Sequence, residues 1–307
     1  KDFKILKFMS ETENYGKAWE GGDKPYVASY GKLMMWFFLI TDTLTFSAFL
    51  ASYGFSRFKY PDIWPSPEDV FTHFPFLHGD HPLLFVALMT FILIMSSVTM
   101  VLAVNYGHKM QKNKVILWLS LTIVGGCMFL GSQAWEWGHF IHGDRGGIDT
   151  KTEHVVHIAE GEDLSSVYSM MGVDGHDGHH HHFTVEQVIT SLQNQEQYNI
   201  RKADKKYLSN EESIKYLKKN ATKVLLGANL EDNEYGHRLF ADYFFFITGF
   251  HGFHVFSGVI ILLIILINVI KGTYERRGHY EMVEKVGLYW HFVDLVWVFV
   301  FTFFYLV

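Results

Sequence analysis

Five long apolar runs constrain this chain more than any other feature of its sequence. They cover approximately residues 33–55, 82–104, 115–137, 240–270 and 288–307. A helix needs about 20 mostly apolar residues to cross the hydrocarbon core of a bilayer. Several of the runs are apolar around the whole helix circumference, unlike a soluble helix that buries a single stripe. The pattern predicts an all-α integral membrane protein with a five-span transmembrane helical bundle.

The amino-acid composition narrows the class of protein further. Hydrophobic residues make up 49% of the 307 positions, yet the mean hydropathy is only +0.08, so very apolar and very polar parts must be combined. The net charge of −6 argues against a nucleic-acid partner, which would require a basic field. The single cysteine, Cys127, excludes an internal disulfide framework and a site with several thiolate ligands.

The spans divide the sequence into four predicted parts. These are an N-terminal tail (1–30), transmembrane helices 1 to 3 (31–142), a polar histidine-rich insert (143–235) and transmembrane helices 4 and 5 (236–307).

Basic residues set the expected orientation, because short loops on the cytoplasmic side of a membrane carry an excess of Lys and Arg. In a five-span arrangement the residues before the first apolar run (1–32) and the connections 105–114 and 271–287 share one side, and together they carry 13 Lys and Arg residues against two in 56–81. The sequence therefore predicts a cytoplasmic N-terminus, with the insert and Val307 on the outer side.

The insert contains two helix candidates. Each opens with a capping box, in which a hydroxyl and a Gln or Glu three residues later satisfy each other's backbone N–H groups. The boxes are Thr184 with Gln187 and Ser209 with Glu212. The second candidate has an apolar stripe made by Ile214, Leu217, Ala221 and Leu225. We expect this stripe to dock on a neighbouring surface, such as an electron-donor domain held outside the membrane.

A histidine run between these parts is a candidate metal site, because neutral imidazole is a good ligand for transition metals. Its members are His176, His179, His180, His181 and His182. The surrounding segment is rich in glycine and lacks apolar anchors, which favours a solvated loop that binds metal only adventitiously.

Polar residues within the spans are the other candidate site, since ionisable groups at membrane depth are costly and are commonly functional. They are Asp42, Gln133, Glu136, Asp242, His251, His254, His291 and Asp294, with His139 one turn beyond Glu136. Three local pairs have the i, i+3 spacing that places both side chains on nearly one helix face: Glu136/His139, His251/His254 and His291/Asp294.

Two interpretations of these polar residues follow. Glu-x-x-His occurs in helical di-iron proteins, but that site needs two such helices and two further carboxylates, and the motif occurs once within the apolar spans, at Glu136 and His139. The other interpretation is that the polar groups form hydrogen bonds with one another between packed helices.

The tryptophans in and near the spans are expected to anchor the helices at the membrane interface. They are Trp36, Trp118, Trp135, Trp137, Trp290 and Trp297.

Several of these residues lie in motifs that resemble subunit III of haem–copper cytochrome oxidases. YWHFVDLVW at 289–297 resembles the family's YWHFVD(V/L)VW, and TGFHGFHV at 248–255 resembles TGFHGxHV. QAWEW at 133–137 and WFFLITD at 36–42 add support, although the family has glutamate where this chain has Asp42. The chain is similar to the family's shorter, five-span form, with an unusual insert of about 90 residues.

The resemblance implies a function. Subunit III carries no redox centre of its own, binds phospholipid and packs against subunit I of a complex that also contains subunit II. Haem and copper reside in those partner subunits, which reduce O2 and pump protons across the bacterial inner membrane. Subunit III supports proton uptake and sustained turnover. The residues expected to form a lipid-binding or structural polar core are Asp42, Gln133, Glu136, His251, His254, His291 and Asp294.

Three alternatives stay open. The chain resembles equally the corresponding component of a quinol oxidase or of a nitric oxide reductase. A different class is a stand-alone membrane metalloenzyme that uses Glu136, His139, His251 and His254. A transporter is disfavoured, because no matching pair of broken spans is evident.

Overall fold

The computed structural model describes residues 29–72, 74–75, 81–152, 154–173 and 182–306. The chain divides into two compact units, residues 1–38 and 39–307, and the second contains both the packed helices and the insert.

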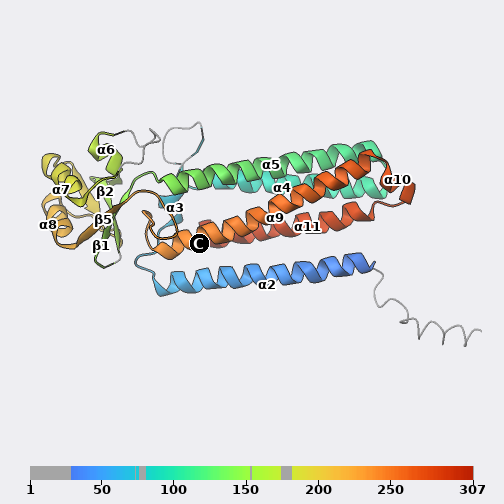
Figure 1. Cartoon of the computed structure of the whole chain (residues 1–307). Coiled ribbons are helices and arrows are strands. Elements are labelled where there is room, and N and C mark those ends of the chain that lie inside the picture. Colours follow the sequence, from blue (N-terminus) through green and yellow to red (C-terminus); the bar gives the residue numbers. More distant parts are fainter. Residues whose placement is uncertain (1–28, 73, 76–80, 153, 174–181, 307) are drawn as a thin grey trace, which may run out of the picture. The chain divides into compact units, whose positions relative to one another are not determined.

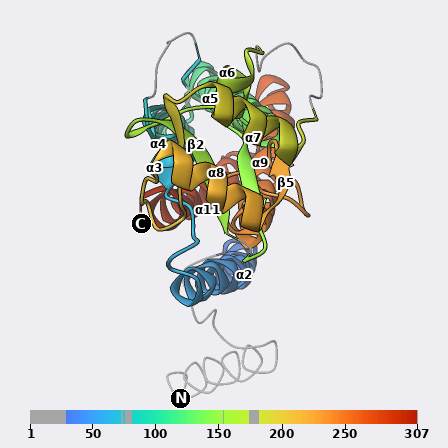
Figure 2. The same cartoon turned by 90° about the vertical axis from the view of Figure 1, so that its left-hand side faces the viewer.

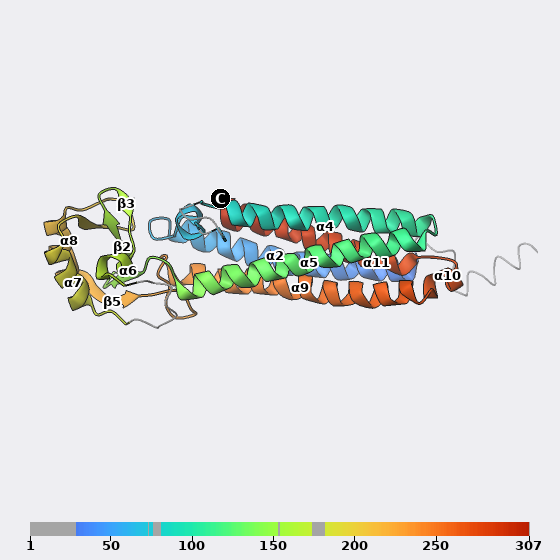
Figure 3. The same ribbon diagram turned by 90° about the horizontal axis from the view of Figure 1, so that it is seen from above.

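Five helices in the described residues are long and apolar enough to cross a membrane, as the five apolar runs predict. They are α2 (Tyr30–Lys59), α4 (Leu84–His108), α5 (Lys112–His142), α9 (Arg238–Ile270) and α11 (Glu281–Val300), which the π-helix η1 (Phe301–Leu306) continues. Two short helices are α3 (Pro67–Val70) and α10 (Thr273–Arg277). Helix α4 packs on α5, α5 on α9, and α11 on both α4 and α9, so that these four run side by side (Figures 1 and 3).

Two tryptophans of α11 fill the centre of this four-helix group. Trp290 and Trp297 are both 0% exposed, although the sequence predicts interface anchors. They are seven residues apart, two helix turns, and therefore lie on one face of α11. Their indole N–H groups donate to hydroxyls of α4, Trp290 to Ser96 at 3.1 Å and Trp297 to Thr90 at 2.9 Å.

Glycine provides the space for one of these rings. A Cβ atom at Gly126 of α5 would lie 2.6 Å from the Trp290 ring. Only a residue without a side chain allows α5 and α11 to approach this closely, which is the usual role of small residues between membrane helices.

The insert between α5 and α9 is a mixed α/β domain, and its sheet was not predicted. Its elements are β1 (Gly147–Thr150), β2 (Val155–Glu160), β3 (Asp163–Leu164), α6 (Val167–Met171), α7 (Val185–Asn194), β4 (Tyr198–Arg201), α8 (Asn210–Asn220) and β5 (Ala221–Leu225). All strand pairs are antiparallel, in the order β3-β2-β1-β5, with β4 also paired to β2. Helices α7 and α8 lie next to each other (Figure 2).

Both predicted capping boxes are present, at Thr184 and at Ser209. The stripe attributed to one helix is divided, because α8 ends at Asn220 and the chain continues as β5. Leu217 is buried in the core of the insert, where Ile214 packs against it. The core of the insert itself covers this stripe, so the stripe is not the surface on which the insert would dock on an electron-donor domain. Docking of the insert on such a domain stays a prediction.

A buried carboxylate joins the two ends of the insert. Glu234 is 1% exposed, and its Oε1 accepts the N–H groups of Asp144 at 2.9 Å and Arg145 at 3.3 Å. Its Oε2 accepts the N–H of Gly227. The N–H of Ala228 donates to the carbonyl oxygen of Ile141 at 3.3 Å. The chain therefore returns to the end of α5 before it begins α9.

Two features of position 227 favour glycine, and a matched pair of substitutions separates their contributions to stability. Its φ is +77°, and an added Cβ would overlap the carbonyl oxygen of Ile141. Gly161 has a φ of +67°, but its Cβ would meet nothing within 4 Å. We expect Gly161→Ala to cost about 1 kcal/mol, from backbone conformation alone. Gly227→Ala should cost at least about 3 kcal/mol, because the backbone must also move.

Denaturant unfolding of the full chain in detergent measures both free energies. Equal losses in the two variants would show that the contact between Gly227 and α5 contributes nothing to stability.

Candidate functional site

The polar residues of the spans find partners mainly on other helices, rather than within the three predicted local pairs. Asp42 of α2 and His254 of α9 face each other, with Oδ2 and Nε2 3.4 Å apart and side chains 15% and 9% exposed. The Nδ1–H of His254 donates to the carbonyl oxygen of Phe250 at 2.8 Å.

Glu136 of α5 belongs to a second cluster. Its side chain is buried, and Oε2 accepts hydrogen bonds from the Gln133 amide at 2.8 Å and the Tyr305 hydroxyl at 3.1 Å. Tyr305 comes from η1, and a π-helical turn at this point is typical of functional or strained segments. His139 lies one turn away, where its ring packs on Trp135 at 3.9 Å between ring centroids.

The remaining polar residues make separate contacts. His251 is 0% exposed, and its Nε2–H donates to the carbonyl oxygen of Val293 at 3.1 Å, with Trp297 beside the ring. His291 contacts the hydroxyl of Ser97 through Nδ1 at 2.6 Å. Asp294 is 7% exposed, and neither of its oxygens meets a donor with hydrogen-bond geometry among the described residues.

These positions do not assemble a metal centre. Within the described ranges, no group of three or more His, Cys, Asp and Glu side chains has a metal-binding arrangement. Glu136, His139, His251 and His254, which the metalloenzyme alternative requires, contact different partners. Of the histidine run, His182 is exposed, and His176, His179, His180 and His181 lie outside the described residues.

An apolar cleft of about 770 Å³ separates α2 from α11 and η1. A volume of this size is within the range of about 300–1,000 Å³ that holds small ligands. Aromatic rings dominate its walls: Phe46, Phe55, Phe58, Phe292, Phe299 and Phe303. Lys59 ends α2, and Arg57 in its last turn has a buried Nη1 without a hydrogen-bond partner.

Sequence reasoning missed several residues of this arrangement. Tyr305, Ser96 and Thr90 are ordinary residues of apolar segments, and no local pattern shows that they face Glu136 or an indole. The seven-residue spacing of Trp290 and Trp297 was a usable signal, because it places both rings on one face of α11.

Fold and site define a multi-pass helical membrane protein with small polar clusters in its interior and an apolar cleft beside α2. A family model for cytochrome c oxidase subunit III matches residues 231–307, which contain α9, α11 and both motifs of these helices.

Curated relatives match the chain as well. The probable cytochrome c oxidase subunit 3 of Rickettsia conorii is 41% identical over 98 residues, 28% of this chain and 34% of that protein. Cytochrome c oxidase subunit 3 of Thermostichus vulcanus is 39% identical over 88 residues, covering 27% and 39%. That of a Synechocystis species is 46% identical over 69 residues, covering 22% and 29%.

The chain thus spans about a third of the length of these relatives. The matches confirm the resemblance predicted from the motifs. The similarity to the family model of cytochrome c oxidase subunit III holds for residues 231–307.

The Asp42–His254 contact can be measured with a double-mutant cycle. We expect Asp42→Asn and His254→Asn to show an interaction energy of about 1–3 kcal/mol in unfolding of the full chain, because the two polar groups face each other at 3.4 Å and are largely shielded from solvent. The control cycle combines Asp42→Asn with His291→Asn, whose side chain contacts Ser97 instead. That cycle should be additive within about 0.5 kcal/mol. Additivity in both cycles would contradict a direct interaction of Asp42 with His254.

Proposed function

We propose that this chain is the non-redox subunit III of a proton-pumping haem–copper terminal oxidase that reduces O2 to water. One observation carries the proposal: the segment that matches the family, residues 231–307, supplies the motif residues that form the interior of the bundle. In this proposal haem and copper reside in subunits I and II, and the chain packs on subunit I. It lies in the bacterial inner membrane, with a cytoplasmic N-terminus and a periplasmic insert and C-terminus.

We propose further that the cleft between α2 and α11 holds phospholipid. Acyl chains suit the aromatic walls, since burial of apolar surface is favourable and hydrogen bonds are not required. The phosphate of the same lipid would lie at the end of α2, where Arg57 and Lys59 provide positive charge. Lipid in this position would fill the space between α2 and the remaining helices.

The polar clusters are proposed to stabilise the bundle and its lipid rather than to conduct pumped protons. Proton conduction needs a continuous chain of exchangeable groups or water. Among the described residues, the hydrogen bonds of Glu136, His251 and His254 do not join their clusters to one another. In this role the chain supports proton uptake by subunit I indirectly, because the intact helical bundle and its lipid support subunit I.

Co-purification tests the assignment. The chain carries an affinity tag and is isolated in mild detergent, and its partners are identified by mass spectrometry. We expect subunits I and II, their haem spectrum and oxidase activity. Recovery of quinol oxidase or nitric oxide reductase subunits would assign a different complex. Isolation of the chain alone with stoichiometric iron that Glu136→Gln removes would establish the metalloenzyme instead.

Two substitutions at Glu136 test the stabilising role. Glu136→Gln keeps an acceptor for the Tyr305 hydroxyl and should leave initial oxidase turnover nearly normal. Glu136→Leu leaves that hydroxyl and the Gln133 amide without an acceptor, which costs about 1–3 kcal/mol for each group. We expect this variant to lose phospholipid and to shorten the active lifetime during sustained turnover. Proton pumping is followed in vesicles over many turnovers. Immediate loss of pumping in Glu136→Gln, with phospholipid unchanged, would show proton conduction through Glu136.

The cleft offers a second test with a matched control. Gly54 lines the cleft, and a side chain there meets nothing within 4 Å. Gly131 of α5 is equally open but does not line the cleft. We expect Gly54→Phe to lower the phosphorus content per purified complex and to shorten its lifetime, because the ring occupies space proposed for acyl chains. Gly131→Phe should leave both unchanged. The same phosphorus content in the two variants would place the lipid elsewhere.

A further inference from the structure

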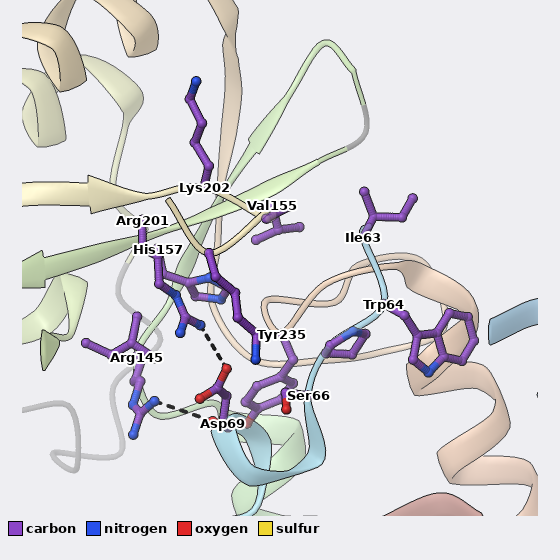
Figure 4. Close-up of a pocket in the computed structure, with 14 residues that line it drawn as sticks. Ile63, Trp64, Ser66, Asp69, Arg145, Val155, His157, Arg201, Lys202 and Tyr235 are labelled. Atoms are coloured by element: carbon purple, nitrogen blue, oxygen red, sulfur yellow. Dashed lines mark hydrogen bonds and ion pairs between the residues drawn. The ribbon is translucent and has the colours of Figure 1, made fainter. Parts of the chain in front are cut away.

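A second cavity, of about 50 Å³, lies between the sheet of the insert and the segment that joins α2 to α3 (Figure 4). A single water needs about 10–15 Å³ on this measure, so the cavity can hold a group of a few non-hydrogen atoms. Arg145, Arg201 and Lys205 lie on its wall, together with Asp69 and Ser66. Among the described lining residues, Asp69 is the one carboxylate.

The two arginines both contact Asp69. Nη2 of Arg201 contacts the Asp69 carboxylate at 3.0 Å, and Nη1 of Arg145 donates to the Asp69 carbonyl oxygen at 3.4 Å. Figure 4 shows both side chains converging on Asp69 from different elements. Nε of Arg201 is buried and has no hydrogen-bond partner. A buried donor without an acceptor is uncommon in native proteins, so the cavity wall lacks an acceptor that a ligand would supply.

The neighbouring histidine adds no charge to this cavity. Burial and the nearby Arg201 and Arg145 charges lower the pKa of His157 to about 4. His157 is therefore neutral at physiological pH, and its Nε2–H donates to the carbonyl oxygen of Glu234 at 2.9 Å. Lys202 also lines the cavity, but its ammonium group lies 4.9 Å from the centre of the Tyr216 ring and points away from Asp69 (Figure 4).

Lys205 shows an unusual backbone. It lies in the tight turn after β4, where its N–H donates to the carbonyl oxygen of Lys202 at 2.9 Å, and its φ is +61°. Glycine or asparagine normally occupies such a left-handed position, because a longer side chain is strained there. Strained residues concentrate at binding sites, where a particular side chain is kept although its backbone conformation is unfavourable. Lys205 lines the cavity, which provides such a requirement for its side chain.

We propose that this cavity binds a phosphate group, either of a lipid or as free phosphate. Donors reach it from four segments: Arg145 after α5, Arg201 on β4, Lys205 in the following turn and Ser66 before α3. The Ser66 side chain accepts no capping hydrogen bond from α3, and its hydroxyl can donate to a bound group. One guanidinium suits a planar carboxylate well, and the Asp69 side chain is already the carboxylate that pairs with Arg201. Tetrahedral phosphate instead offers several acceptor oxygens to donors that converge from different directions.

The test uses the delipidated full chain in detergent, titrated calorimetrically with inorganic phosphate at constant ionic strength. The wild type should bind phosphate saturably, and acetate at equal concentration should not compete. Lys205→Gly should bind phosphate about tenfold more weakly, as expected for the loss of one charge-assisted hydrogen bond. It should nevertheless melt at a temperature no lower than that of the wild type, because glycine relieves the positive φ.

The matched control is Lys206→Ala, next in sequence. Lys206 pairs with Asp204 at 3.0 Å, its side chain is 77% exposed, and it does not line the cavity. This variant should keep the affinity of the wild type. Absence of saturable phosphate binding, equal affinity in Lys205→Gly and wild type, or equal competition by acetate would each overturn the proposal.

The source of the phosphate is decided by a second titration, with a water-soluble short-chain phosphatidic acid. Binding at least tenfold tighter than that of inorganic phosphate, and weakened by Lys205→Gly, identifies a lipid headgroup. Equal affinities identify free phosphate. Both results support a phosphate site, and neither depends on which oxidase contains the chain.

Discussion

Hydrocarbon around the spans deprives polar side chains of water, so each must find its partner within the protein. Much of the bundle follows from this constraint. Indole N–H groups of α11 meet hydroxyls of α4, and the Glu136 carboxylate meets Tyr305. Such contacts fix the rotation of each helix about its axis, because a small rotation would leave both partners unsatisfied. Small residues such as Gly126 then permit the close approach that these hydrogen bonds require.

The spans were predictable from the sequence, whereas their contacts were not. A run of 20 apolar residues is a local signal, and so is a capping box. The i, i+3 spacing of His251 and His254 shows that both face one side of α9, but it does not identify the opposite helix. His254 faces Asp42 of α2, and His251 faces a backbone carbonyl of α11. The partner of each histidine depends on how the helices pack. The residues next to His251 and His254 in the sequence do not determine that packing.

The insert illustrates the same limit for strands. Its strands are two to six residues long, too short for a reliable alternation of apolar and polar residues. β1 pairs with β5 more than 70 positions later, a contact that no sequence window contains. The stripe from Ile214 to Leu225 keeps helical spacing past Asn220, although the last five residues are extended. Periodicity alone could not detect this change, because β5 is selected by its pairing with β1.

A domain of this size between two packed helices requires that its ends remain close together. The Glu234 carboxylate meets this requirement by binding the N–H groups of Asp144, Arg145 and Gly227, which come from both ends of the insert. Helices α5 and α9 therefore pack as though a short loop joined them. Arg201 adds a separate attachment, through Asp69, to the segment between α2 and α4. A phosphate in the proposed cavity would strengthen that attachment, because it would supply an acceptor for the buried Nε–H of Arg201.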